Sequence, residues 1–330
     1  MFAKKYFEII SNDFIECRIC PNNCKIKNGR SGFCGTRENQ TGKLFLKTYG
    51  KISGAAFDPI EKKPLYHFYP NREILSIGSV GCNLKCIFCQ NSDISQEYNF
   101  DYLYSAPSEQ LLELSQKNKN NIGIAFTYNE PLINFEFVLD TAKYFIEHNQ
   151  KTVIVSNGLI NDEPLRELLP YLSAANIDLK GDNDFYKKNC YAGSFDNVLS
   201  IIEKIYKSGK IVEVTNLVVS GLNDNIQSIK KIVDAVSEIS ADIPLHFSRY
   251  FPRYKYSAPA TDIAILENAY DYAITKLKYV YIGNISSNNY NNTICKICGN
   301  IVIKRFGYNS ETKLINGCCS NCNAEIYGEF

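Results

Sequence analysis

Apolar, strand-like segments alternate with helix-like segments along the middle of the chain, and this alternation restricts the possible folds. Each strand-like segment precedes a segment of helical periodicity, and the strands are expected at residues 74–80, 122–128, 151–158, 175–181, 211–220 and 243–251. Apolar strands separated by helices are typical of a parallel sheet that is covered on both faces. Six right-handed strand–helix units therefore predict an α/β fold, in the form of a partial, open TIM-like (β/α)6 barrel rather than a closed barrel of eight.

The chain is long enough for one large core and for smaller modules beside it. It has 330 residues, of which 45% are hydrophobic and 13% aromatic. We expect a cysteine-rich metal-binding segment with a β-hairpin at residues 1–72, the partial barrel at 73–285, and a zinc-ribbon-like module at 286–330. The division places thirteen cysteines in three clusters and a few single positions.

The loop after the first expected strand carries three cysteines, in the sequence GCNLKCIFCQN at 81–91. These cysteines are Cys82, Cys86 and Cys89. A structural zinc ion or an ordinary iron–sulfur cluster takes four protein ligands, so three would leave one iron of a 4Fe-4S cluster open. S-adenosylmethionine could occupy that iron with its amino and carboxylate groups and accept an electron there. A zinc ion completed by His67 or Cys190 is the plainer alternative.

Polar residues collect near the ends of the other expected strands. Chemistry in parallel barrels lies at the carboxyl ends of the strands, so these residues would form one ring with the triplet. The candidates for cofactor binding are Asn129, Glu130, Ser156, Asn157, Lys180 and His246, with Asp178 beside Lys180. For Glu130 the alternative role is to cap the following helix, and for His246 it is packing in the core.

Two further cysteine groups lie towards the ends of the chain. The C-terminal group has zinc-ribbon spacing, which favours zinc over a rubredoxin-like iron or an auxiliary cluster, and comprises Cys295, Cys298, Cys319 and Cys322. The N-terminal group suits either zinc or a second iron–sulfur cluster, and comprises Cys17, Cys20, Cys24 and Cys34. We expect Cys190 to be a buried or incidental thiol.

Charge and hydropathy restrict the class and location of the protein. The formal net charge of +1 argues against non-specific binding of nucleic acid by the whole surface. Residues 1–72 contain thirteen Lys and Arg against six Asp and Glu, a surplus that could face an acidic partner or RNA. The first residues do not resemble a signal peptide and no apolar run reaches membrane-spanning length, so we expect a cytoplasmic protein without a membrane partner. In that compartment, clustered cysteines favour metal binding over disulfides.

The motifs resemble those of radical S-adenosylmethionine enzymes. The Cys-x3-Cys-x2-Cys spacing, with the aromatic Phe88 directly before the last cysteine, is similar to the signature of that superfamily. More narrowly, the chain resembles the radical enzyme of the AmmeMemoRadiSam system, which is related to pyruvate formate-lyase activating enzymes. This likeness covers almost the whole chain and rests on the N-terminal cysteines, GKLFLKTYGKISGAAFDPIEKKPLYHFYP, SIGSVGCNLKCIFCQN, FTYNEP, IDLKG, LHFSRYFP and YIGNI.

The resemblance implies a role for each candidate. The triplet would ligate a 4Fe-4S cluster, Asn129 and Glu130 would lie near the amino group of S-adenosylmethionine, and Ser156 and Asn157 near its ribose or carboxylate. Lys180 and His246 are further candidates for the carboxylate or ribose. The implied activity is reductive cleavage of S-adenosylmethionine to a 5′-deoxyadenosyl radical, which abstracts hydrogen from a substrate such as a protein. An electron donor such as flavodoxin or ferredoxin would be needed.

Two alternatives follow from the same residues. Activases of glycyl-radical enzymes have an acidic residue before the Thr-Asn-Gly turn that helps to hold a cation, and this chain has Val155 there. A glycyl-radical activase is therefore the second expectation among enzymes. The alternative of a different class is a non-catalytic carrier of metal or clusters, or a zinc-ribbon protein that binds nucleic acid.

Overall fold

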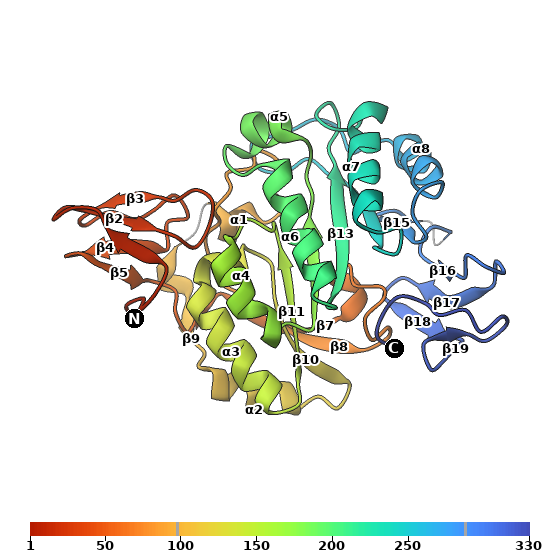
Figure 1. The fold of residues 1–330 in the computed structure, drawn as a ribbon, viewed down its shortest axis with the longest axis horizontal. Coiled ribbons are helices and arrows are strands. Elements are labelled where there is room, and N and C mark those ends of the chain that lie inside the picture. The colour runs from red at the N-terminus through yellow and green to blue at the C-terminus, as the bar shows by residue number, and fades with distance from the viewer. Residues whose placement is uncertain (97–98, 287–288) are drawn as a thin grey trace.

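The computed structural model describes residues 1–96, 99–286 and 289–330, and its centre is a large sheet (Figure 1). Over the described residues this sheet has eight strands in the order β15-β14-β13-β12-β11-β10-β8-β7. Their bounds are β7 (Gly54–Pro59), β8 (Glu73–Gly78), β10 (Asn121–Phe126), β11 (Lys151–Ser156), β12 (Ala174–Asp178), β13 (Ile211–Val218), β14 (Leu245–Arg249) and β15 (Val280–Gly283).

The strands from β8 to β15 run parallel, and β7 pairs with β8 in the antiparallel direction. The six strands expected from the sequence are β8 and β10 to β14, so the expectation of a parallel α/β sheet is confirmed. Two edge strands were not expected from the repeating pattern, because β15 is short and β7 is followed by a single short 3-10 helix, η1 (Ile60–Lys62), rather than an α-helix before β8. In the described part of the chain β7 and β15 are the two ends of this sheet.

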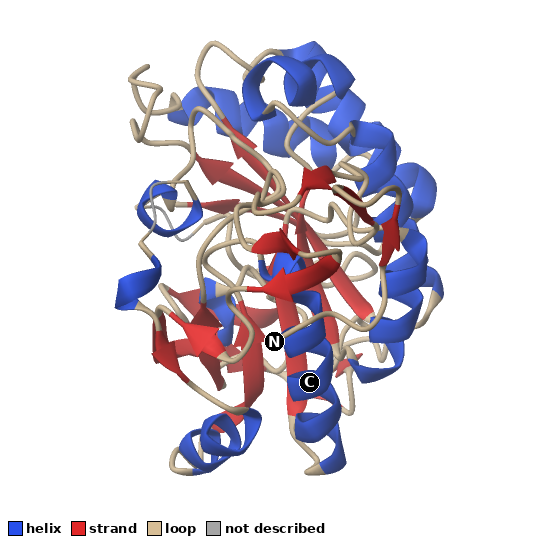
Figure 2. Cartoon of the chain, turned by 90° about the vertical axis from the view of Figure 1, so that its left-hand side faces the viewer, coloured by secondary structure: helices blue, strands red, loops and turns tan. Residues whose placement is uncertain are grey.

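Helices pack along the outer side of the sheet (Figures 1 and 2). They are α2 (Ser108–Gln116), α3 (Phe135–Glu147), α4 (Asp162–Leu168), α6 (Phe195–Lys207), α7 (Ile226–Ile239) and α8 (Ile263–Ala273). In α6, Ser194 accepts a hydrogen bond from the Asn197 amide at the first turn, and Ile201, Ile202 and Ile205 are buried. Burial of such side chains contributes about 1.5–3 kcal/mol each, which holds the helix on the sheet.

The N-terminal residues form small antiparallel sheets on one side of the large sheet, at the left of Figure 1. These contain β1 (Phe7–Ile9), β2 (Phe14–Cys17) and β3 (Lys25–Lys27), the hairpin β4 (Arg37–Gln40) and β5 (Lys43–Leu46), and β6 (Lys51–Ile52) with β9 (Tyr104–Ser105). Arg37 pairs with Glu136 of α3 at 2.6 Å, and the arginine side chain is buried. This ion pair fastens the N-terminal sheets to the helical layer.

The C-terminal residues form a separate small module at the opposite side. Its strands are β16 (Thr293–Ile294), β17 (Ile301–Phe306), β18 (Asn309–Thr312), β19 (Leu314–Ile315) and β20 (Cys318–Cys319). Arg305 donates to the carbonyl of Tyr66 at 2.6 Å, and Ser310 donates to Glu61 at 2.8 Å. The module is thereby held against the segment that closes the amino-terminal end of the sheet.

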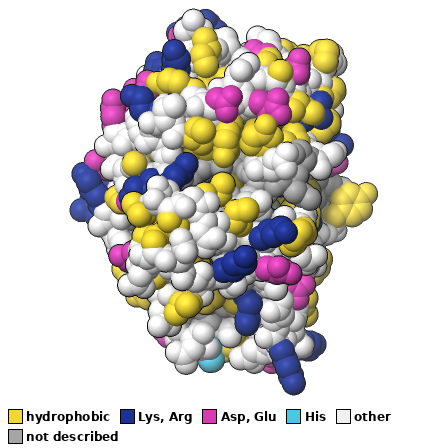
Figure 3. Space-filling view, turned by 90° about the vertical axis from the view of Figure 1, so that its right-hand side faces the viewer, with side chains coloured by type: hydrophobic (Ala, Val, Ile, Leu, Met, Phe, Trp, Pro, Cys, Tyr) yellow, Lys and Arg dark blue, Asp and Glu magenta, His cyan; other side chains and the backbone are white. Residues whose placement is uncertain are grey.

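The surface on the side of this module carries charges of both signs among apolar side chains (Figure 3). Such a mixture differs from the continuous basic face that binds nucleic acid by charge alone. Within residues 1–96, 99–286 and 289–330, no helix is both long and apolar enough to cross a lipid bilayer.

Candidate functional site

A cavity of about 420 Å³ lies at the carboxyl ends of the parallel strands. This volume is within the range of about 300–1,000 Å³ that is usual for small-molecule sites. Its lining joins the triplet loop to the ends of β10, β11, β12, β13 and β14, and includes Cys82, Leu84, Cys86, Phe88, Cys89, Gln90, Asn129, Glu130, Val155, Ser156, Asn157, Asp178, Lys180, Thr215 and Ser248. The structure therefore brings the triplet and most of the sequence candidates to one place.

The triplet cysteines lie in a buried environment that disfavours bare thiolates. Burial, together with the nearby charge of Glu130, raises the pKa of Cys82 well above its usual value. Contact with the thiol of Cys190, together with burial, does the same for the pKa of Cys86. Such buried thiols are deprotonated when a metal cluster binds them. Three cysteines on one loop that line one cavity are the donor set of a 4Fe-4S cluster with one open iron, so the residues present fit such a cluster.

Asn129 ties the start of the triplet loop to the end of β8. Its Oδ1 accepts a hydrogen bond from the Ser79 amide at 2.8 Å, and its Nδ2 donates to the Gly81 carbonyl at 3.1 Å. Asn129 also lines the cavity, as the sequence predicted. These hydrogen bonds nevertheless make Asn129 first of all a support for Gly81, the residue that precedes Cys82.

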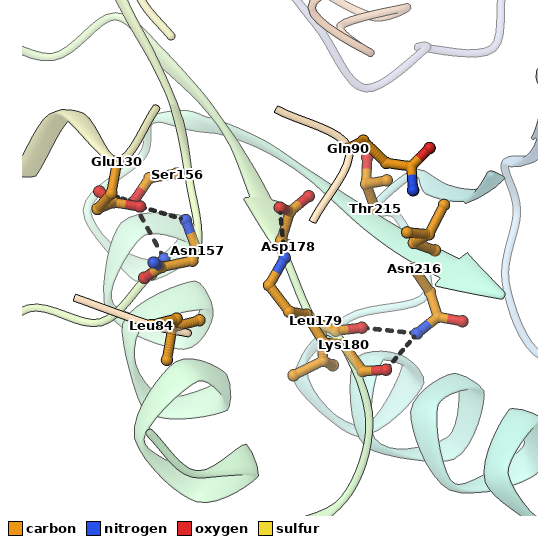
Figure 4. Close-up of polar contacts among 12 residues, drawn as sticks. Leu84, Gln90, Glu130, Ser156, Asn157, Asp178, Leu179, Lys180, Thr215 and Asn216 are labelled. Carbon is orange, nitrogen blue, oxygen red and sulfur yellow. Dashed lines mark hydrogen bonds and ion pairs between the residues drawn. The ribbon is translucent and has the colours of Figure 1, made fainter. Parts of the chain in front are cut away.

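Glu130 connects β10 with β11 through three hydrogen bonds within the described residues. Its Oε1 accepts from the Leu132 amide at 2.9 Å and from the Ser156 hydroxyl at 2.8 Å, and its Oε2 accepts from the Asn157 amide at 2.8 Å (Figure 4). Burial raises its pKa to about 7, although these donors favour the ionised form. The bond to Leu132 is a helix cap, so the capping role and a place in the cavity coexist.

Asn157 joins the end of β11 to the triplet loop. Its Nδ2 donates to the Asn83 side chain at 2.9 Å and lies 3.6 Å from the Cys82 sulfur. Asn83 in turn donates to the Leu159 carbonyl at 2.8 Å. The residues around Cys82 are therefore positioned by amide side chains before any ligand binds.

An ion pair from β12 forms another wall of the cavity. Lys180 Nζ lies 2.8 Å from Asp178 Oδ2, and Asn216 donates to the backbone carbonyls of Leu179 and Lys180 (Figure 4). Burial disfavours the charged lysine, but the charge of Asp178 outweighs this effect and the pKa of Lys180 is raised. The cavity thus presents a fixed positive charge beside a carboxylate.

His246 does not belong to this lining, which differs from the sequence prediction. Its Nε2 lies 2.6 Å from Glu213, and its ring packs against Tyr66 and Tyr281. His246 does share the inner face of β14 with Ser248, because residues two apart on a strand point to the same side. Ser248 lines the cavity, whereas His246 lies two residues closer to the amino-terminal end of β14 and does not line it.

His67 and Cys190, which the zinc alternative would use, lie in different places. His67 is buried below β13 to β15, beside the polar side chains of Glu213, His246 and Tyr281, and this buried polar layer is called the floor. The backbone amide of His67 donates to Glu213 at 2.7 Å. Cys190 lies under the triplet loop, and its carbonyl accepts a hydrogen bond from the Lys85 amide at 2.8 Å. His67 therefore lies apart from the triplet, whereas the thiol of Cys190 contacts that of Cys86. Among the described residues neither forms a compact set of metal ligands with the triplet, and the triplet by itself does not form one either.

Sequence reasoning missed several lining residues. Thr215 and Leu217 on β13 and Ser248 on β14 line the cavity, and Gln90 follows directly after the last triplet cysteine. Side chains two residues apart on a strand point to the same side, so the sequence of β13 could have predicted that Thr215 and Leu217 face the cavity together. The role of Cys190 beside Cys86 had no local signal, because the two are far apart in the chain.

The four C-terminal cysteines converge as the zinc-ribbon pattern predicted. Their sulfurs all lie within 4.8 Å of one another, with 3.6 Å between those of Cys295 and Cys322 and 3.7 Å between those of Cys298 and Cys319. Four sulfurs around zinc would lie about 3.8 Å apart, because Zn–S bonds are about 2.3 Å long. This group can bind a single metal ion.

The similarities of this chain to known proteins agree with a metal and cofactor site in the cavity. Residues 76–236 match the model of the radical SAM superfamily. The uncharacterized protein MJ0808 of Methanocaldococcus jannaschii is 42% identical over 329 residues, which covers 98% of this chain and 97% of that protein. The pyruvate formate-lyase-activating enzyme of Clostridium pasteurianum is 27% identical over 169 residues, covering 48% of this chain and 67% of the enzyme.

Among solved structures, Streptococcus suis SuiB bound to S-adenosylmethionine has a similar fold. The TM-score is 0.52 at 17% sequence identity, and the match covers 64% of this chain and 52% of SuiB. SuiB bound to the precursor peptide SuiA matches with a TM-score of 0.51 at 18% identity, over 69% of this chain and 52% of SuiB. The match to the superfamily model includes the triplet, and the fold places the triplet at the strand ends. This chain belongs to the radical SAM superfamily.

Proposed function

We propose that this protein is an enzyme that reductively cleaves S-adenosylmethionine and uses the 5′-deoxyadenosyl radical to take hydrogen from a substrate. The observation that carries the proposal is the position of Cys82, Cys86 and Cys89 in one cavity with the polar ends of the neighbouring strands. A carrier of metal ions would have no need of such a cavity beside its ligands.

The chain's own residues would hold and shield the reactants. When bound, a 4Fe-4S cluster on the triplet and S-adenosylmethionine supply the electron and the radical. Leu84, Phe88 and Val155 give the cavity apolar walls, and Phe88 is buried against Phe185 at a ring distance of 5.5 Å. Such walls keep water away from a reactive radical.

Charged and polar groups would orient the cofactor. Glu130 uses three of the roughly four acceptor positions of a carboxylate within the described residues, which leaves capacity for the cofactor's amino group. Lys180 would attract the carboxylate, and Asn157 and Ser156 would bind a ribose hydroxyl or the carboxylate. His246, with its partner Glu213 in the floor, has no such role in this proposal.

The substrate class in this proposal is a protein or peptide. It is supported by SuiB, which was solved with a precursor peptide, and by relatives named as activating enzymes of other enzymes. A glycyl-radical activase is a narrower form of the same proposal, and the apolar Val155 in the cavity wall speaks against the cation site of such activases. The sequence motifs support a place in the AmmeMemoRadiSam system, in the cytoplasm, with flavodoxin or ferredoxin as electron donor.

We further propose that Cys295, Cys298, Cys319 and Cys322 bind structural zinc. The support is the convergence of their four sulfurs at distances close to those of a zinc tetrahedron. The metal would link the two knuckles of the C-terminal module.

The proposed reaction is tested anaerobically with reconstituted protein, dithionite and S-adenosylmethionine, by following 5′-deoxyadenosine and sulfur-to-iron absorbance. We expect Cys86→Ala to abolish the product and the absorbance that arises from the triplet. Cys318→Ala is the matched control, because this cysteine belongs to none of the three groups, and it should retain both. Product formation by Cys86→Ala at the wild-type rate would refute the mechanism. Zinc in every site and no cofactor binding would favour the carrier alternative.

A further inference from the structure

We propose that Cys17, Cys20, Cys24 and Cys34 hold an iron–sulfur cluster rather than a zinc ion, on the far side of the triplet loop from the S-adenosylmethionine cavity. The spacing of these cysteines in the sequence suits either metal centre. The tertiary structure distinguishes the two, because the arrangement of the four sulfurs differs from that in the C-terminal module.

The first observation is the separation of the sulfurs. Of the possible metal ligands in the described residues, the C-terminal cysteines form a group that converges within 4.8 Å, and the N-terminal four do not form such a group. The triplet, which fits a 4Fe-4S cluster, does not converge in this way either. In a cubane each cysteine binds a different iron, so the sulfurs stand farther apart than around one zinc ion. The N-terminal group follows the pattern of the triplet.

The second observation is the space between the sulfurs. All four cysteines line one small cavity of about 20 Å³, together with the apolar side chains of Ile19, Ile26 and Ile133. A cavity needs roughly 10–15 Å³ to hold one water molecule, so the four cysteines share one enclosed space with room for little more than that. They therefore face one common, mostly apolar centre and would hold one metal group together.

The third observation is an unused donor beside this cavity. Arg37 also lines it, its side chain is buried, and its Nε has no hydrogen-bond partner within the described residues. The rest of the guanidinium binds Glu136 and the Ile133 carbonyl. A buried donor without an acceptor is costly, and the thiolates or sulfides of an anionic cluster would accept this hydrogen bond.

The cavity is also protected from solvent by the triplet loop itself. Each group has two buried cysteines, but the other two differ: Cys20 and Cys24 are half-buried, whereas Cys298 and Cys322 of the C-terminal module are exposed. A Cβ added at Gly81, which has a φ of +88°, would lie 2.7 Å from the Cys34 carbonyl oxygen. Burial of this kind suits a cluster that must be kept from water and oxygen more than it suits a zinc knuckle.

A second contact joins the two sites on the other flank of Cys82. Asn22 donates to the Asn83 carbonyl at 2.9 Å, and Asn83 lines the N-terminal cavity while its side chain binds Asn157. The residues before and after Cys82 therefore both pack against the N-terminal cysteine segment. The N-terminal group is a part of the same metal-binding region, although it is separated from the cofactor cavity by the loop.

The test uses the full chain with the triplet removed, Cys82→Ala, Cys86→Ala and Cys89→Ala together, after anaerobic reconstitution with iron and sulfide. Iron, sulfide and zinc are counted per chain, and the reduced sample is examined by electron paramagnetic resonance. We expect about four iron and four sulfide to remain, with the signal of a reduced cluster. Zinc or a single iron without sulfide in this group, or no metal there, would overturn the proposal. Because the triplet is absent, the result does not depend on the proposed reaction.

Two further variants in the same triplet-free background assign the remaining iron. Adding Cys20→Ala and Cys24→Ala should remove iron and sulfide together. Adding Cys295→Ala and Cys319→Ala should remove zinc and retain iron. Iron that persists without Cys20 and Cys24 but is lost without Cys295 and Cys319 would place the cluster in the C-terminal module and refute the assignment.

Discussion

Single side chains around the triplet act mainly as supports for its loop. Asn129 binds the Gly81 carbonyl, Asn157 binds Asn83, and Glu130 accepts the Asn157 amide. Each of these bonds joins a strand end to a residue beside Cys82 or to another residue of the same network. The cavity is therefore preorganised by hydrogen bonds that also bury polar groups at low cost.

Replacement of Glu130 by Gln tests this support. The amide nitrogen of glutamine would face one of the donors that the carboxylate now accepts, either at Oε1 or at Oε2. We expect Glu130→Gln to lower the free energy of unfolding by about 1–3 kcal/mol, measured by urea titration at pH 8, above the pKa of about 7.

Glu109→Gln on the exposed face of α2 is the matched control, because Glu109 lies at the surface. It should change the free energy of unfolding by less than about 0.5 kcal/mol. Equal stabilities of the Glu130 and Glu109 variants would show that the network contributes nothing measurable.

At the scale of elements, the strands β13, β14 and β15 meet the segment 64–68 in a buried polar floor. Glu213 accepts from the His67 amide at 2.7 Å and pairs with His246 at 2.6 Å. His67 Nδ1 lies 2.6 Å from the Tyr327 carbonyl, which can only accept, so this nitrogen carries the proton. Nε2 then accepts from the Tyr281 hydroxyl at 2.7 Å. The floor requires a neutral His67.

The floor predicts a dependence of stability on pH. Burial lowers the pKa of His67 to about 4 from its usual 6.5, with Glu213 opposing the effect. The unfolded chain therefore binds a proton that the folded chain does not as the pH falls from about 6.5 to 4, and stability is lost over this window. Between pH 7 and pH 5 we expect His67 to account for a loss of about 2 kcal/mol, measured by urea unfolding at both values.

Two variants separate this contribution from that of other groups. His67→Gln should be less stable at pH 7 but should lack this part of the pH dependence. His148→Gln, at the exposed end of α3, should keep the wild-type dependence. The lowered pKa of Glu213 acts mainly below the usual carboxyl range, but the raised pKa of Glu130 acts in the measured window with the opposite sign, because folded Glu130 takes up a proton below about pH 7. The contribution of His67 is therefore the difference in pH dependence between the wild type and His67→Gln. An unchanged slope in His67→Gln would contradict the assigned protonation state.

At the scale of the whole molecule, the two terminal modules lie on opposite sides of the central sheet (Figure 1). The N-terminal module packs under the triplet loop, whereas the C-terminal module packs on the floor. Cys295, Cys319, Val302 and Ile303 share a buried cluster with Tyr66, Tyr279 and Tyr281. Each module therefore continues a different end of the central core.

Loss of zinc from the C-terminal module should therefore destabilise the floor, on which that module packs. We expect Cys319→Ala to lose one zinc per chain and to weaken hydrogen-exchange protection in β17 and in residues 60–68, because zinc binding and folding are coupled in such modules. Protection of α3, which binds the N-terminal sheets through Glu136, should remain. Cys318→Ala is the control, and full protection of β17 in zinc-free Cys319→Ala would contradict a structural role for the metal.

Much of the candidate site was accessible from local sequence. The short spacing of Cys82, Cys86 and Cys89 and their position after a strand sufficed to predict a metal site at the mouth of the sheet, because loops after parallel strands meet there. The alternating pattern of the strand could not show which of His246 and Ser248 lines the cavity. Both lie on the same face of β14 and differ only in their distance from its carboxyl end. The sequence pattern also could not show that Cys190 lies beside Cys86, because that contact joins residues distant in the chain.

The sequence alone determined the parallel α/β architecture and the three cysteine groups, because hydrophobic periodicity and ligand spacing are local properties that survive without knowledge of contacts. Only the tertiary structure decided which polar residues share the cavity, that His246 belongs to the floor, and that the N-terminal sulfurs do not converge as closely as the C-terminal ones. Those features depend on distances between segments that are remote in the chain. Packing of the whole core sets these distances, and no short stretch of residues encodes them.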